Sequence, residues 1–340
     1  MVLADYVNTF GQAMLHRYGE RVHKIAIDAG FTCPNRDGAK GRGGCTFCNN
    51  ASFSPNGRQP APLADQIAAG RRVIRKRTGA DKYIGYFQAY TNTYADLAEL
   101  RRLYDQALAE PDIIGLSIGT RPDCVGIEVL NLLADYRQQG YEVWLELGLQ
   151  SAFDETLRRV NRGHGFAEYA ATLRAARSRG LQVCTHLIVG LPGETVRHCH
   201  TTLARVLDLG VDGLKLHPLQ VVKGTQLANE WRRGLYQPLS LESYISIAAD
   251  IVERTPPEVI FHRLTGTAAP GLLLAPAWCT KKWLVLNGIT RELAARRVCR
   301  QGRFSGLNWR DHDYGRGSGE SRAPGYRSCT AALEIVPCKI

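Results

Sequence analysis

A unit of amphipathic helix, glycine and apolar strand repeats along the middle of the chain. Three copies follow one another: NLLADYRQQG-YEVWLELGLQ, ATLRAARSRG-LQVCTHLIVG and TTLARVLDLG-VDGLKLHPLQ. Each helix ends at a glycine (Gly140, Gly180 or Gly210), which readily adopts the left-handed conformation that closes a helix. The strand that follows is rich in Val, Leu and Ile with little alternation, as expected for parallel strands covered on both faces.

Earlier segments follow the same pattern. Strands are predicted at 23–29, 82–88 and 112–119, and helices near 62–78, 95–109 and 126–139. About six successive β/α units predict an α/β fold whose core is a parallel (β/α) barrel, which we expect to be partial. Its functional residues would lie at the carboxyl ends of the strands. An open doubly wound sheet is the alternative, because periodicity does not show whether a sheet closes.

The pattern weakens after residue 222. Helices are expected at 240–254 and over most of 275–297, with one strand at 259–263. We therefore assign residues 1–222 to the barrel, 223–300 to a C-terminal extension packed on it, and the Gly-, Arg- and Ser-rich residues 301–340 to a disordered tail.

Three cysteines lie on one long loop, residues 30–50, directly after the first predicted strand. Cys33, Cys45 and Cys48 have the spacing C-x11-C-x2-C, with a glycine-rich stretch between the first two. The glycines allow Cys33 to fold back toward the Cys45–Cys48 pair, so all three can reach one metal centre. A cubane cluster held by three thiolates keeps one iron open for chemistry, whereas four thiolates suit electron transfer.

Other interpretations of these thiols compete. Structural zinc prefers four ligands, which would require His23 or a distant cysteine. A redox-active C-x-x-C usually opens a helix directly after a strand and needs no third thiol. Most of the ten cysteines stand singly in apolar runs, as Cys184 does, which is typical of buried thiols rather than of a disulfide framework.

The cysteine loop resembles that of the radical S-adenosylmethionine superfamily, with an aromatic residue before the last cysteine. Its wide first gap resembles the branch that contains the catalytic subunit of Elongator. Further motifs of that branch follow in order: GTRPDC (119–124), ELGLQSAFDETLRRVNRGH (146–164), HLIVGLPGET (186–195) and LKLHPLQVVKGTQL (214–227). HRLTGTA (262–268) and LLLAPAWCTKKW (272–283) resemble a bacterial family within that branch.

The resemblance implies that Cys33, Cys45 and Cys48 bind a [4Fe–4S] cluster. The open iron would chelate S-adenosylmethionine, and an electron from a flavodoxin- or ferredoxin-like protein would cleave it to methionine and a 5′-deoxyadenosyl radical. That radical would act on an unidentified substrate. The cofactors carry the difficult chemistry, and the protein orients them and excludes water.

The resemblance also implies three contacts to the nucleotide. Phe47 would pack near the cluster and the adenine. Arg162 would pair with the methionine carboxylate, and Gln150 would hydrogen-bond a ribose hydroxyl, both of which suit these side chains. No residue that acts on the substrate is identified.

Two departures from the superfamily concern the same nucleotide. Where relatives have a glycine run that approaches the methionine amino group, this chain has the bulkier Ala89, Tyr90 and Thr91. Relatives often carry an acid at the position of Gly119, and His186 replaces an acid found in some of them. Ala89, Tyr90, Thr91 and His186 are therefore expected to contact the cofactor, with contacts to the nucleoside that differ from those in relatives.

The net charge of +11 and the basic segment RRVIRKR at 71–77 raise the question of a polyanionic partner. A solvated helical face and an RNA-binding surface explain the segment equally well, and tRNA is a candidate substrate. No apolar run is long enough to span a membrane and no secretory signal is present, so a cytoplasmic protein is expected. An iron–sulfur electron-transfer protein and an RNA-binding protein with a structural metal site are the alternative functions.

Overall fold

The computed structural model describes residues 2–49, 51, 60–269, 271–297 and 301–302. The tail predicted at 301–340 lies outside these residues except for its first two positions.

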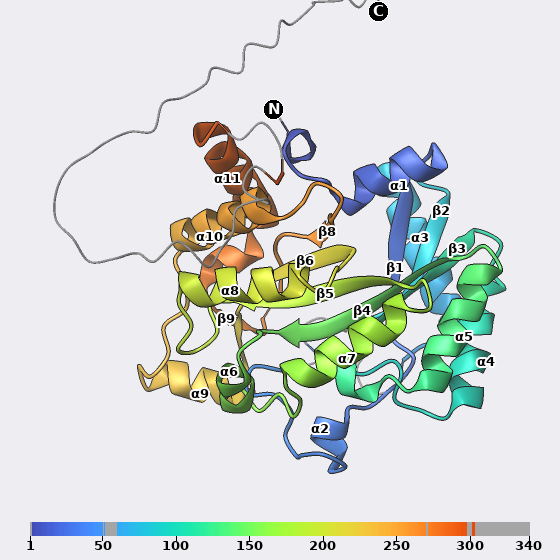
Figure 1. The fold of residues 1–340 in the computed structure, drawn as a ribbon, viewed down its shortest axis with the longest axis horizontal. Coiled ribbons are helices and arrows are strands. Elements are labelled where there is room, and N and C mark those ends of the chain that lie inside the picture. Colours follow the sequence, from blue (N-terminus) through green and yellow to red (C-terminus); the bar gives the residue numbers. More distant parts are fainter. Residues whose placement is uncertain (1, 50, 52–59, 270, 298–300, 303–340) are drawn as a thin grey trace, which may run out of the picture. The chain divides into compact units, whose positions relative to one another are not determined.

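Seven parallel strands form the main sheet (Figure 1). They are β1 (Val22–Ile27), β2 (Lys82–Phe87), β3 (Ile113–Thr120), β4 (Glu142–Gln150), β5 (Gln182–Val189), β6 (Gly213–Pro218) and β8 (Ile260–Arg263). The strands stand in the sheet in chain order, and every neighbouring pair is parallel. A doubly wound sheet reverses its order at a switch point, so that alternative is wrong. The expected α/β partial barrel is confirmed.

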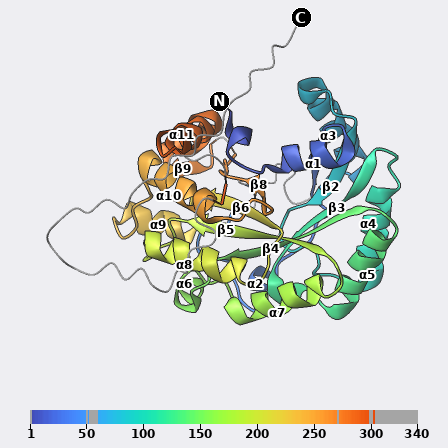
Figure 2. The ribbon, with the colours of Figure 1, turned by 45° about the horizontal axis from the view of Figure 1, so that its top comes forward.

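Helices cover the outer side of the curved sheet, as Figure 2 shows for α4, α5, α7 and α8. The helices that connect successive strands are α3 (Leu63–Thr78), α4 (Leu97–Leu108), α5 (Ile127–Gln138), α7 (Phe166–Arg177), α8 (Val196–Leu207) and α10 (Leu241–Arg254). The remaining helices are α1 (Phe10–Tyr18), α2 (Pro34–Asp37), α6 (Asp154–Arg159), α9 (Gln226–Arg232) and α11 (Lys282–Ala295). Short 3-10 helices span Leu3–Asp5, Pro122–Cys124 and Ala277–Thr280.

The segment after residue 222 does more than pack on the barrel, because it supplies the seventh strand, β8. It also contributes β9 (Leu273–Ala275), which pairs antiparallel with β7 (Val221–Val222). Within the described part of the chain no hydrogen-bonded pair joins β8 back to β1. Instead, the backbone N–H of Phe261 donates to the carbonyl of Asn8, 2.8 Å away, so the N-terminal segment covers the β8 edge.

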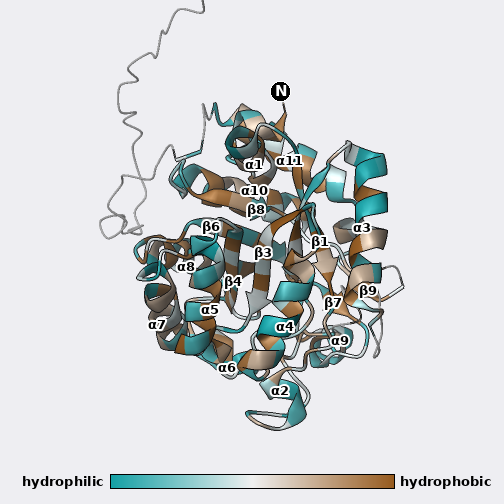
Figure 3. Ribbon diagram, turned by 90° about the vertical axis from the view of Figure 1, so that its right-hand side faces the viewer, coloured by the Kyte–Doolittle hydropathy of each residue, from teal (hydrophilic) through white to brown (hydrophobic). Residues whose placement is uncertain are grey.

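The two faces of β4 show how the interior is layered. Leu145, Leu147 and the other odd-numbered residues face the outer helices and are fully buried in the main apolar core; in Figure 3 the central strands are coloured largely as apolar. Trp144 and Glu146 point to the inner side. Trp144 packs against Phe10 of α1, and Glu146 contacts side chains from strands that are not its neighbours in the sheet. The interior is thus apolar at the amino ends of the strands and charged at mid-height.

Candidate active site

A cavity lies at the carboxyl ends of the strands, with the cysteine loop as one wall. Cys33, Cys45 and Cys48 all line it, as free thiols. Cys45 is buried and the other two are half-buried. Residues separated by up to fifteen positions on the loop therefore present their sulfur atoms to one space, as the C-x11-C-x2-C spacing led us to expect.

Local turns fold the loop back on itself. Cys33 precedes the single turn of α2 (Pro34–Asp37), which Gly38 caps with φ of 100°. Gly44 has φ of 81°, which favours glycine, and its N–H donates to the carbonyl of Asn35 at 2.8 Å. This bond brings the end of the glycine-rich stretch beside the start of the loop, which places Cys45 near Cys33.

Polar and cationic groups surround the thiols. The Cys45 sulfur accepts from Arg162 Nη1 at 3.5 Å and from Asn35 Nδ2 at 3.8 Å. Arg36 donates to the carbonyl oxygen of Cys48. Burial and the nearby Cys45 raise the pKa of Cys48, which Arg36 in part offsets. Thiols crowded together in this way can lose their protons on binding a shared metal centre, because the metal neutralises the thiolate charges.

This donor set fits a cluster with three protein ligands better than zinc. Of the seven cysteines in the described residues, only the three on the loop line the cavity. His23, which could have been a fourth ligand, lies on β1 and does not line it either. A tetrahedral structural zinc site would lack its fourth ligand from these candidates.

Most of the residues expected to contact S-adenosylmethionine line the same cavity. They are Phe47, Tyr90, Thr91, Gln150, Arg162 and His186. Ala89 is buried and does not line it. Tyr90 and Gln150 have positive φ, 62° and 81°, which non-glycine residues adopt at a cost of about 1–3 kcal/mol and mainly at functional sites.

Arg162 is held against the end of β4. Its Nη2 donates to the carbonyl of Gly148 at 2.6 Å, and a Cβ on Gly148 would lie only 2.8 Å from the same nitrogen. A larger residue at this position would therefore force the end of the Arg162 side chain to shift. Arg162 is 8% exposed, and its Nε has no protein partner. A buried guanidinium N–H without a partner is costly, so this side chain suits an anionic ligand in the cavity.

Below the cavity, Glu146 forms a buried ion cluster. Its carboxylate pairs with Lys24 Nζ at 2.5 Å and with the ammonium group of Lys215, and accepts from His186 Nε2 at 2.7 Å. Burial by itself would raise the pKa of Glu146, but Lys215 and Lys24 hold it well below its usual value. The carboxylate is therefore ionised.

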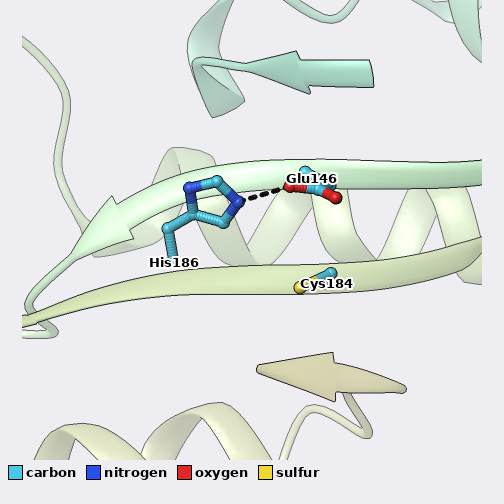
Figure 4. A group of neighbouring side chains, drawn as sticks. All are labelled: Glu146, Cys184 and His186. Atoms are coloured by element: carbon cyan, nitrogen blue, oxygen red, sulfur yellow. Dashed lines mark hydrogen bonds and ion pairs between the residues drawn. The ribbon is translucent and has the colours of Figure 1, made fainter. Parts of the chain in front are cut away.

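Glu146, Cys184 and His186 also offer three metal-ligand atoms within 4.8 Å of one another (Figure 4). Two ammonium groups already neutralise this carboxylate, however, and burial raises the pKa of the Cys184 thiol well above its usual value. A cation would have to displace both lysines. We interpret the group as part of the ion cluster and not as a metal site.

Several cavity residues had no role in the sequence interpretation. They are Arg36, Tyr86, Arg121, His217 and Arg263. Arg121 lies in GTRPDC, His217 in LKLHPLQ and Arg263 in HRLTGTA. The sequence motifs therefore contained these residues, but the motifs alone did not indicate what each residue does. Arg121 is 2% exposed and its Nη1 has no protein partner, although its other nitrogens bind Asp123 at 3.0 Å.

The basic segment at 71–77 is the last turns of α3, and acids neutralise part of it. Arg71 pairs with Glu110 at 2.8 Å and also with Asp112, while Arg75 pairs with Asp81 at 3.0 Å. Arg72, Lys76 and Arg77 have no carboxylate partner among the residues described. The free positive charge of this helix is thus smaller than the sequence suggests. Among the described helices, none is both long and apolar enough to cross a membrane.

Comparisons with known proteins find matches along most of the chain. The family model of the Radical SAM superfamily matches residues 33–206, and that of the Radical_SAM C-terminal domain matches residues 211–295. Protein YhcC of Escherichia coli is 50% identical over 309 residues, which cover 91% of this chain and 98% of that protein.

Two further similarities are more distant. The tRNA uridine(34) acetyltransferase of Dehalococcoides mccartyi is 33% identical over 159 residues, 46% of this chain and 34% of that protein. The solved structure of archaeal Methanocaldococcus infernus Elp3 superposes with a TM-score of 0.62 at 21% identity, covering 82% of this chain and 63% of that one. The latter likeness concerns the fold alone.

Proposed function

Because this chain belongs to the radical SAM superfamily, in its Elongator-like branch, we propose that Cys33, Cys45 and Cys48 hold its cluster and that the adjoining cavity binds S-adenosylmethionine. The family assignment makes the protein an enzyme of this class, with a [4Fe–4S] cluster and S-adenosylmethionine as cofactors. The placement of both on particular residues is our proposal. When bound, they supply a 5′-deoxyadenosyl radical, once a flavodoxin- or ferredoxin-like protein has donated an electron.

The observation that carries this proposal is the meeting of three thiols and Arg162 in one cavity. Arg162 touches the Cys45 sulfur and has a buried nitrogen without a partner. A methionine carboxylate beside the cluster would satisfy that nitrogen with a charge-assisted hydrogen bond. The hydrogen bond from Arg162 to the Gly148 carbonyl would keep the guanidinium in place for this ligand.

Other residues would position the nucleoside. Gln150 ends β4 with its side chain at the cavity and can bind a ribose hydroxyl. Phe47 offers an aromatic face for the adenine. Tyr90 and Thr91 form the wall where relatives have glycines, and the Thr91 hydroxyl is buried without a protein partner, so it can serve the methionine amino group.

Cofactor cleavage tests the proposal directly. Anaerobic, cluster-loaded and reduced protein should convert S-adenosylmethionine to 5′-deoxyadenosine and methionine, slowly without substrate, as measured by liquid chromatography and mass spectrometry. Arg162→Ala should weaken S-adenosylmethionine binding about 10- to 100-fold, because one charged hydrogen bond is removed, while iron content stays near wild type. Arg158→Ala, an exposed arginine of α6 outside the cavity, is the control. A reduced cluster whose spectrum ignores S-adenosylmethionine would support an electron carrier instead.

We further propose tRNA as a candidate substrate, because a relative of the chain is a tRNA uridine(34) acetyltransferase and the net charge is +11. Since acids already bind Arg71 and Arg75, the free charges of α3 that could contact phosphates are Arg72, Lys76 and Arg77.

Reversing those three charges to Glu should lower affinity for tRNA and reduce the slope of log affinity against log salt by about 1 for each phosphate that is no longer bound. Fluorescence anisotropy with labelled tRNA measures both. The control is the same reversal at Arg101 of α4, Arg158 of α6 and Arg233 of the turn after α9, all exposed arginines. If tRNA binding shows no salt dependence, and tRNA nucleosides from cells with and without the gene are identical by mass spectrometry, tRNA is not the substrate.

A further inference from the structure

We propose that the part of the cavity at the carboxyl ends of β6 and β8 is a substrate site for an anionic group, a phosphate or a carboxylate, and that Arg263 binds that group. This inference rests on the proposed function, because it assigns the part of the cavity around the cysteines to the cofactors and the part around Arg263 to the substrate.

The charges that line the cavity are unbalanced. Four arginines line it and, within the described residues, no aspartate, glutamate or lysine does. Arg36, Arg121 and Arg162 lie on the cysteine side, where a protein carbonyl, a carboxylate or a thiol already accepts from each. Arg263 lies at the carboxyl end of β8 and is exposed, and none of the carboxylates in the described part of the chain forms an ion pair with it.

The ion cluster beneath Arg263 adds positive charge to this end. The Cα atoms of Arg263 and Lys215 are partners in the β6–β8 register. Lys24 and Lys215 share the single carboxylate of Glu146, so basic groups outnumber acidic ones in the cluster, although burial lowers the pKa of both lysines. The Lys215 side chain is 3% exposed, and charges so poorly solvated act over longer distances than surface charges. A cavity wall of this kind attracts an anion.

Two neutral imidazoles stand beside Arg263. Burial lowers the pKa of His186 to about 4, and burial followed by Arg263 lowers the pKa of His217 well below its usual value. His186 donates from Nε2 to the ionised Glu146, so its Nδ1 carries a lone pair, and this nitrogen points away from Glu146 in Figure 4. Both rings line the cavity, with centroids 5.7 Å apart.

The backbone near β8 is shaped around His217. A Cβ on Gly266 would lie 2.8 Å from His217 Nδ1, so glycine is needed for the two to approach. Gln220 Nε2 donates to the Gly266 carbonyl at 2.7 Å and keeps this loop in place. The arrangement suits a substrate whose anionic group pairs with Arg263 while a neighbouring hydroxyl or N–H donates to an imidazole nitrogen.

The test uses cluster-loaded, oxidised protein saturated with S-adenosylmethionine, so that the cofactor's own carboxylate site is filled and no cleavage occurs. Inorganic phosphate, acetate and dimethyl phosphate are titrated at constant ionic strength, and binding is followed by calorimetry and by the shift in melting temperature. Preference for phosphate indicates a phosphate monoester, for acetate a carboxylate, and for dimethyl phosphate a nucleic-acid backbone.

Wild-type protein should bind at least one of the three probes saturably, and Arg263→Gln should weaken that binding about tenfold or more while its melting temperature without probe stays unchanged. Arg233→Gln, an exposed arginine of the turn after α9, should bind as wild type. Equal binding by Arg263→Gln, or no saturable binding of any probe, overturns the proposal. If the wild-type protein binds an anion in this way but, once reduced, does not cleave S-adenosylmethionine, that result would count against the proposed function alone.

Discussion

Cys33→Ala, Cys45→Ala and Cys48→Ala should each abolish cluster binding, whereas anaerobically reconstituted wild-type protein should hold about four irons and four sulfides per chain. The physical reason is the ligand count: the three thiols that share the cavity are the minimum for a cubane with one open iron, and none of the other described cysteines lines that cavity to replace a missing one. Iron and sulfide assays with the visible absorption spectrum measure the outcome.

Two matched cysteines provide the control for this experiment. Cys124→Ala and Cys199→Ala should load iron as the wild type does, because neither side chain lines the cavity. Cys199 is buried, so its substitution also controls for a small loss of stability. Tight stoichiometric zinc without iron uptake, or full iron content in any of the three loop variants, would contradict the assignment.

Glu146→Gln should cost about 3–5 kcal/mol of unfolding free energy, because it leaves Lys24 and Lys215 buried without a counter-ion. The pKa of Glu146 lies well below its usual value, so the native carboxylate is ionised and this stabilisation is present above the ordinary pKa of a glutamate. It would be lost progressively as the pH falls below that ordinary pKa and through the lowered native pKa. Urea unfolding of the metal-free protein under anaerobic conditions at pH 7 measures the difference.

The control for Glu146 is an ion pair of the same chemical type at the surface. Glu99 pairs with Arg102 at 2.7 Å, with both side chains about half exposed to solvent, and Glu99→Gln should change the unfolding free energy far less than Glu146→Gln, because water screens this pair. A similarly small effect of Glu146→Gln would mean that the buried lysines release their protons at little cost, and that the ion cluster does not hold the barrel interior together.

Local patterns in the sequence determined the elements of this protein. Gly140, Gly180 and Gly210, expected to close three helices, have φ of 96°, 72° and 77°. The predicted helix at 126–139 is α5 (Ile127–Gln138), and the predicted strand at 259–263 is β8 (Ile260–Arg263). These features depend on side-chain periodicity and backbone preference within a few residues, which any single sequence displays. The cysteine spacing likewise placed three thiols on one loop.

Only the tertiary structure decided how those elements meet. Glu146 pairs with Lys24, 122 positions earlier, and with Lys215, 69 positions later, and no local pattern records such pairs. No local pattern showed that β8, from the C-terminal segment, joins the main sheet. Nor did one show that Glu110 and Asp112 neutralise the charge of Arg71. Arg263 and His217 reach the cavity because the sheet curves and keeps chain order. Burial and charge at a site are sums over contacts between distant segments, so they exist only in the folded chain.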